Sequence, residues 1–104
     1  MFFLMVCHHH ADVADLRDRL RPDHRAWVAS GGGGLATVLT GSALWGDAGQ
    51  GIGNFGVLAA ADAAAARAFA DGDPFAKGGV VARVEITRLA DTFQADRIRP
   101  LTGG

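Results

Sequence analysis

The chain has 104 residues, which suits one domain with a modest hydrophobic core. Its formal net charge is −1 and its arginines are scattered, so neither nucleic acid nor an anionic membrane is an expected partner. Cys7 is the only cysteine, which excludes an internal disulfide and is typical of a reducing compartment. The apolar opening is too short for a membrane span and lacks the basic segment of a signal peptide. We therefore expect a cytoplasmic protein.

Four stretches have the pattern of β-strands. The first is apolar on both of its faces, which is typical of a central strand covered on both sides. The later ones are rich in β-branched residues or alternate between apolar and polar positions. In chain order, the predicted strands are residues 1–10, 35–44, 54–60 and 80–89.

Two helices are expected between these strands. Pro22 would interrupt a helix that continued from residues 11–20, but it suits the first position of a new one, so the first main helix is placed from Arg21 or Pro22 to about Ser30. Residues 11–20 are then a short helix or an ordered loop. The second helix, residues 61–70, is nearly pure alanine, the best helix former.

Four consecutive glycines, residues 31–34, follow the first helix. We interpret them as a helix cap with a flexible exit. A phosphate-binding loop is the other interpretation of such a run. It is disfavoured because no strand precedes these glycines, no helix follows them, and the Lys-Ser/Thr pair of a P-loop is missing.

The order of elements is β-α-β-β-α-β, which predicts an α+β fold of the ferredoxin-like sandwich type, with two helices on one face of four antiparallel strands. Such a sheet leaves its other face open, although the first strand is apolar on both sides. A second copy packed sheet to sheet would cover that face, so we predict a homodimer. The domain is expected to span residues 1–90. Residues 91–104 form a polar tail that is partly disordered or packed on a partner subunit, with Phe93 and Ile98 as anchors.

His24 is the candidate catalytic residue, and Asp73 is its candidate partner. Helical spacing places His24 on the same face as Trp27 and Val28. A histidine is the usual proton carrier of an active site, and a carboxylate can fix its tautomer. The alternative is that His24 caps a helix or lies on the surface and that Asp73 is a turn residue before proline. Spacing alone leaves both interpretations open.

The run His8-His9-His10 raises the question of a metal site. Only His8 and His10 share a face of a strand, and two ligands are fewer than a catalytic metal usually has. We therefore predict no metal and no cofactor, and expect these histidines to line the end of the strand near His24. Metal binding through His8 and His10 remains a third alternative. Cys7 is interpreted as a small core residue.

Four features follow one another in order between the opening strand and about Leu89. They are Arg21-Pro22 followed by His24, the strand glycine Gly41, the alanine-rich helix running into Asp73-Pro74-Phe75, and a glycine at 78 or 79 before the last strand. In this order and spacing the chain resembles the YCII-like family of small bacterial proteins. The resemblance implies a dimeric α+β barrel with a pocket in each subunit and a His-Asp pair at positions matching His24 and Asp73. It also implies a link to the breakdown of chlorinated aromatic ring-cleavage products, by proton abstraction with loss of chloride.

The predicted function is acid/base chemistry of the lyase or isomerase type, with dehydrochlorination as a candidate reaction, on a small organic acid. His24 would be the general acid or base, oriented by Asp73. The backbone at Gly41 and the hydroxyl of Ser42 would hold a polar group of the substrate, and Phe75 would shape the pocket. The alternative function is that of a non-catalytic dimeric protein that binds a small ligand or modulates a partner.

Overall fold

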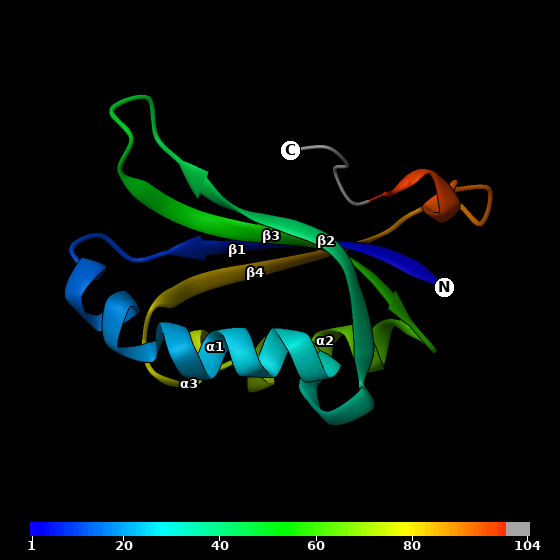
Figure 1. The fold of residues 1–104 in the computed structure, drawn as a ribbon, viewed down its shortest axis with the longest axis horizontal. Coiled ribbons are helices and arrows are strands. Elements are labelled where there is room, and N and C mark those ends of the chain that lie inside the picture. Colours follow the sequence, from blue (N-terminus) through cyan, green and yellow to red (C-terminus); the bar gives the residue numbers. More distant parts are fainter. Residues whose placement is uncertain (100–104) are drawn as a thin grey trace.

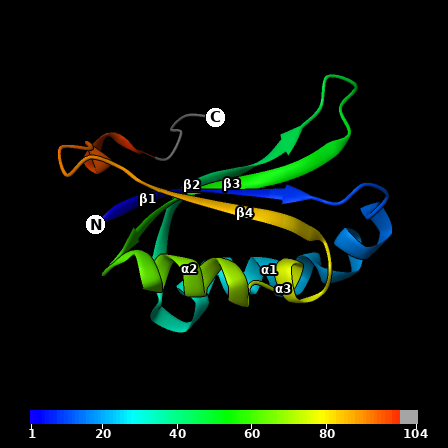
Figure 2. The ribbon, with the colours of Figure 1, turned by 180° about the vertical axis from the view of Figure 1, so that it is seen from behind.

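A four-stranded antiparallel sheet carries its helices on one face (Figure 1). This computed structural model describes residues 1–99. Its elements are β1 (Phe2–His9), α1 (Ala14–Gly34), β2 (Ala36–Trp45), β3 (Gly51–Ala60), α2 (Ala63–Gly72), α3 (Pro74–Lys77), β4 (Val81–Arg88) and the 3-10 turn η1 (Ala95–Arg97). The strand order is β2-β3-β1-β4. Both α1 and α2 lie below the sheet in Figure 1 and also in the reverse view of Figure 2, so they cover the same face. The predicted ferredoxin-like α+β fold is confirmed.

The core lies between the sheet and the helices. Alternation along β1 turns Phe3, Met5 and Cys7 toward the helices, where they are buried, while the intervening residues of the strand are half-buried on the outer face. Phe69 of α2 is fully buried against this layer. The small alanines around it let α2 lie close to the sheet, so the alanine-rich composition serves packing as well as helix formation.

Helix α1 differs from the sequence prediction at Pro22. The helix begins at Ala14 and contains Pro22 in its interior, so the expected break is wrong. A proline inside a helix costs about 3 kcal/mol. Contacts on both sides of it offset that cost: Arg17 is held by His9 and by the carbonyl of Gly51, and the indole of Trp27 donates to the carbonyl of Phe69 at 3.0 Å. In Figure 1 the first turns of α1, in blue, lie at an angle to the later turns, in cyan.

The glycine run forms a defined left-handed turn. Right-handed helical geometry ends at Ser30, as the sequence predicts, and the next three glycines have φ angles of 61°, 65° and 75°. The Ser30 hydroxyl accepts a hydrogen bond from the amide of Gly33 at 3.2 Å. Gly31 is buried. The run is therefore a specific connection between α1 and β2, where the sequence predicted a flexible exit.

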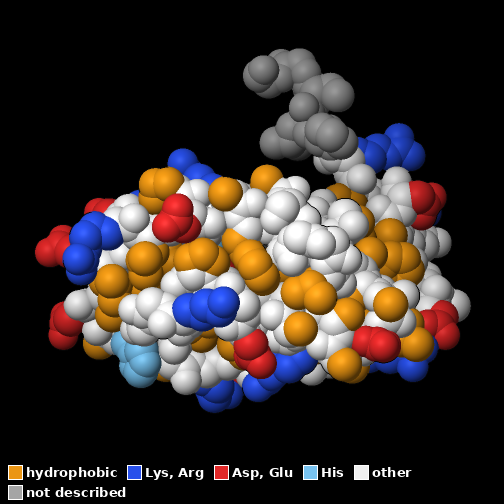
Figure 3. All heavy atoms as spheres, turned by 90° about the horizontal axis from the view of Figure 1, so that it is seen from below, with side chains coloured by type: hydrophobic (Ala, Val, Ile, Leu, Met, Phe, Trp, Pro, Cys, Tyr) orange, Lys and Arg blue, Asp and Glu red, His pale blue; other side chains and the backbone are white. Residues whose placement is uncertain are grey.

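The outer face of the sheet is partly covered by the tail of its own chain. The Phe93 ring packs edge to face on Phe2, with ring centroids 5.4 Å apart. Residues 100–104 of the predicted tail lie outside the described residues. The helix side of the molecule carries cationic and acidic side chains intermixed with hydrophobic ones (Figure 3). No helix among residues 1–99 is long and apolar enough to cross a membrane.

Candidate active site

The structure brings His24 and Asp73 into direct contact. His24 projects from α1, and Asp73 lies in the connection between α2 and α3. Nδ1 of His24 is 2.8 Å from each carboxylate oxygen of Asp73. Asp73 is 5% exposed, and its Oδ1 also accepts the backbone N–H of Phe75 at 2.9 Å. The carboxylate is thus fixed as the N-cap of α3, where Pro74 occupies the first turn.

The imidazole of His24 is held in one orientation. Phe75 stacks on it, with ring centroids 4.0 Å apart and planes 5° from parallel. Nδ1 faces two acceptor oxygens, so it carries the proton and donates it to Asp73. Nε2 of the neutral ring is then an acceptor, and it forms no hydrogen bond with any of residues 1–99. This is the arrangement of a general base whose tautomer is set by a carboxylate.

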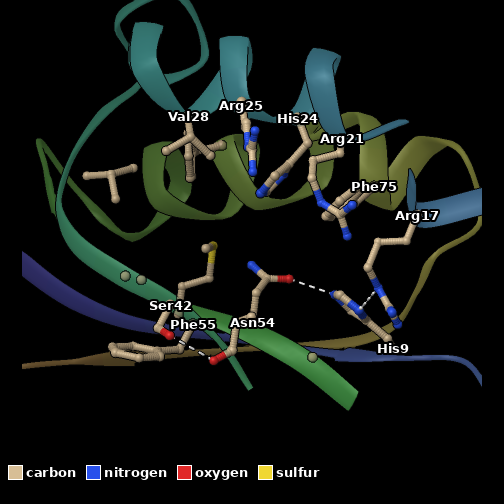
Figure 4. Close-up of a pocket in the computed structure, with 17 residues that line it drawn as sticks. His9, Arg17, Arg21, His24, Arg25, Val28, Ser42, Asn54, Phe55 and Phe75 are labelled. Carbon is tan, nitrogen blue, oxygen red and sulfur yellow. Dashed lines mark hydrogen bonds between the residues drawn. The ribbon is translucent and has the colours of Figure 1, made fainter. Parts of the chain in front are cut away.

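A cavity of about 300 Å³ lies between α1 and the sheet, and His24 lines it. Arg17, Arg21 and Arg25 line it too, because residues four apart lie on one face of a helix. In Figure 4 the ring of His24 lies between Arg21 and Arg25, all pointing from α1 toward the strands. No carboxylate lines the cavity in the described part of the chain. The remaining lining residues are Met5, His9, Val28, Val38, Gly41, Ser42, Ala43, Gly53, Asn54, Phe55, Gly56, Phe69 and Phe75.

Glycines make the floor of the cavity. Gly41 of β2 faces Gly56 of β3 in the register, and Gly56 shares the inner face of β3 with Asn54. Inward positions without side chains leave empty space below α1. Gly41 has a second role, because a Cβ there would lie 2.6 Å from the carbonyl oxygen of Phe55. The absence of a side chain at Gly41 thus allows the neighbouring strand β3 to approach closely.

Ser42 is placed differently from the sequence prediction. Asn54 pairs with Ala43 and shares the inner face with the buried Cys7, so Ser42 and its partner Phe55 lie on the outer face of the sheet. The Ser42 hydroxyl donates to the carbonyl of Ala43 at 2.9 Å. Ser42 reaches the edge of the cavity, but its hydroxyl is not directed into it.

The sequence placed the histidine run near His24, and His9 does line the same cavity, but the cluster that it forms there with Arg17 and Asn54 was missed. Nε2 of His9 is 2.7 Å from Oδ1 of Asn54, and Nε of Arg17 donates to Nδ1 of His9 at 3.2 Å. Burial lowers the pKa of His9, which favours its neutral form. The available signal was the alternation of β1, since His9 shares parity with the buried Cys7.

The other two histidines of the run lie away from the cavity. His8, on the outer face, is 2.8 Å from a carboxylate oxygen of Glu85, and His10 is exposed beyond the strand. Among residues 1–99 no group of three His, Cys, Asp or Glu side chains is placed to hold a metal ion. Burial, followed by the charge of Asp73, raises the pKa of Cys7 to about 12, so its thiol stays protonated and unreactive.

Comparison with known proteins identifies the family. The sequence pattern of the YCII-related domain matches residues 1–90. The chain belongs to the YCII-related domain family. The resemblance noted in the sequence is thereby confirmed. No curated protein matches the chain at a significant level.

A solved structure with the same fold as this YCII-related chain comes from Burkholderia phenoliruptrix AC1100. It is 5-chloro-2-hydroxyhydroquinone dehydrochlorinase (TftG), in complex with 2,5-dihydroxybenzoquinone. The two chains superpose with a TM-score of 0.75 at 21% sequence identity, over 86% of this chain and 94% of that one. At this identity the similarity supports the fold.

Proposed function

We propose that this YCII-related protein is an enzyme that performs acid/base chemistry of the lyase or isomerase type on a small organic acid. One observation carries the proposal. His24 binds a buried carboxylate through Nδ1 and lines a cavity, which leaves Nε2 free to exchange a proton with a substrate. Asp73 would keep the ring in this tautomer and stabilise the imidazolium that forms when Nε2 takes a proton.

The charge of the cavity supports an anionic substrate. Three arginines and two histidines line it, with no carboxylate among the lining side chains of the described residues. A guanidinium binds carboxylate and phenolate oxygens through several N–H groups. Arg17 is engaged by hydrogen bonds to His9 and to the Gly51 carbonyl, and Arg21 by an ion pair with Asp18. Within residues 1–99 Arg25 has neither kind of side-chain partner, so it is the arginine most available to a ligand.

The reaction would begin with removal of a proton from a carbon next to a carbonyl group. Nε2 of His24 takes the proton, and the electron pair of the broken C–H bond moves onto the carbonyl oxygen as an enolate. In an isomerase the proton returns at another carbon. In a dehydrochlorinase the electron pair forms a new C=C bond, the C–Cl bond breaks, and chloride leaves. The activity of the structurally similar TftG makes this second outcome the first to test.

The test is a turnover assay of the wild-type protein. Small hydroxy- and chloro-substituted acids, together with 5-chloro-2-hydroxyhydroquinone, are supplied without added metal or cofactor. We expect turnover of at least one compound, measured as chloride release or as a change in ultraviolet absorbance. Ligands that bind but are not converted would favour a non-catalytic binding protein. Absence of both binding and turnover across the panel would contradict the proposed substrate class.

We also propose that the protein acts as a cytoplasmic homodimer. The single thiol suits a reducing compartment. Alternate residues of β1 on the outer face, among them Leu4 and Val6, are apolar and only half-buried in one copy of the chain. A second sheet packed on this face would remove that apolar surface from water.

The oligomeric state is measured by light scattering coupled to gel filtration. We expect a particle of twice the chain mass of 10.8 kDa. Leu4→Glu, on the outer face, should yield monomers, whereas Ala64→Glu, at an exposed position of α2, should not. A monomeric wild type at high concentration would rule out the dimer.

A further inference from the structure

The polar cluster formed by His9, Arg17 and Asn54 has a fixed assignment of hydrogen-bond donors and acceptors. A guanidinium can only donate hydrogen bonds, so the nitrogen of His9 that Arg17 contacts, Nδ1, must be an acceptor. The proton of the neutral ring therefore sits on Nε2, which must donate, and the atom of Asn54 that receives it must be the amide oxygen. The chain of contacts thus settles both the tautomer of His9 and the orientation of the Asn54 amide.

The consequence is that the NH₂ group of Asn54 is left for the cavity. Figure 4 shows its nitrogen turned up toward α1 and its oxygen turned toward His9. The thiol of Cys7 is a neighbour of this amide, but sulfur is a weak acceptor and the NH₂ group has two N–H bonds. At least one strong donor of Asn54 is therefore available to a ligand.

We propose that Asn54 binds the carbonyl or enolate oxygen of the substrate, and that His9 and Arg17 act as positioning residues that hold its amide in the donating orientation. The inference deepens the proposed function and rests on it. Asn54 lies on β3, in the floor of the cavity, while His24 lies on α1, in its roof. A flat substrate between them would meet the base on one face of the cavity and the donor on the other.

The chemistry requires a donor of this kind. When His24 removes a proton next to a carbonyl group, negative charge develops on the carbonyl oxygen. A hydrogen-bond donor already in place there stabilises that charge without reorganising, and such a donor is worth about a hundredfold or more in rate. The neutral state of His9 matters for the same reason. Protonation of His9 at Nδ1 would place a second donor opposite the Nε–H of Arg17. The hydrogen bonds that orient the Asn54 amide would then be broken.

Asn54→Asp is the decisive variant. An aspartate keeps the size of the side chain and still accepts from Nε2 of His9, but it presents an anionic acceptor to the cavity in place of a donor. The probe is 2,5-dihydroxybenzoquinone, with affinity measured by titration calorimetry and the carbonyl stretching band of the bound probe measured by infrared difference spectroscopy. We expect Asn54→Asp to weaken binding by about tenfold or more and to return the carbonyl band toward its position in free solution.

His9 variants test the positioning role. His9→Leu removes the donor to Asn54, whereas His9→Gln can still accept from Arg17 and donate to Asn54. We therefore expect His9→Gln to retain more affinity than His9→Leu. His8→Leu, one residue away on the outer face, is the matched control and should leave the carbonyl band unchanged. Circular dichroism melting checks that each variant folds, and Asn54→Ser is the substitute if Asn54→Asp does not.

The outcomes separate this inference from the proposed function. Wild-type binding that persists in Asn54→Asp with an unshifted carbonyl band would overturn the role of Asn54 and leave the His24 chemistry standing. Equal loss of affinity in His9→Gln and His9→Leu would overturn the positioning role of His9. A wild type that does not bind the quinone would overturn the substrate class and, with it, the role given to Asn54.

Discussion

Replacing His24 by alanine should lower kcat by about a thousandfold for the substrate that the turnover assay identifies. Within the described residues, the variant removes the only imidazole on the cavity wall that is held by a buried carboxylate. The measurement is steady-state kinetics of purified wild type and variant. His8→Ala is the control, because His8 contacts Glu85 on the other face of the sheet. Wild-type kcat in His24→Ala would show that the base has been misassigned.

Asp73→Asn tests the same His24–Asp73 pair by changing its carboxylate. The backbone N–H of Phe75 requires an acceptor at Oδ1, so the new NH₂ group must occupy the Oδ2 position and face Nδ1 of His24. Nδ1 then becomes an acceptor, and the proton of the ring moves to Nε2. The base is thereby blocked, although the fold and the α3 cap are kept. A similar tautomer error in a serine protease triad costs about ten-thousandfold.

Two measurements distinguish this mechanism from a loss of structure. The ¹⁵N chemical shifts of His24 should change from the Nδ1–H to the Nε2–H pattern in Asp73→Asn, and this readout needs no substrate. The double variant His24→Ala with Asp73→Asn should be no slower than His24→Ala alone, because the two residues act as one unit. Additive losses, or an unchanged tautomer, would contradict the pairing on which the proposed mechanism rests.

Local residue patterns in the sequence were sufficient to predict the fold. Alternation, the alanine-rich segment and the glycines placed the elements in the right order, with bounds off by a few residues. The larger errors have tertiary causes. β3 begins at Gly51 rather than at residue 54, because pairing with β2 holds glycines in a strand that their own propensity would not form. α1 continues through Pro22 because contacts on both sides anchor it.

The site was less accessible to sequence reasoning. His24 followed from its place on a helix face, and Asp73 from the family resemblance. His9, Arg17 and Asn54 come from three different elements, so their meeting depends on strand register and helix placement. A slip of one residue between β1 and β3 would turn Asn54 away from the cavity. That register is a property of the folded sheet, and no local pattern contains it.

The turn after α1 is where we expect the largest effect on stability. Gly31→Ala should lower the free energy of unfolding by roughly 4 kcal/mol, which is a large fraction of the stability of a small domain. Gly31 has a φ of 61°, a conformation that costs an L-residue about 1–2 kcal/mol. A Cβ there would also lie 1.8 Å from the carbonyl oxygen of Ala36, so the start of β2 would have to move. The measurement is urea unfolding followed by circular dichroism.

Gly33→Ala separates the two causes. Gly33 has a similar φ of 75°, but a Cβ there would meet no heavy atom within 4 Å. This variant should lose only the conformational term, about 1–2 kcal/mol, and the difference between the two variants measures the clash. Equal losses would show that strand β2 yields without cost and that the turn is not held rigidly. A rigid turn matters for function, because it sets the path from the helix that carries His24 to the strand that carries Gly41 in the floor of the same cavity.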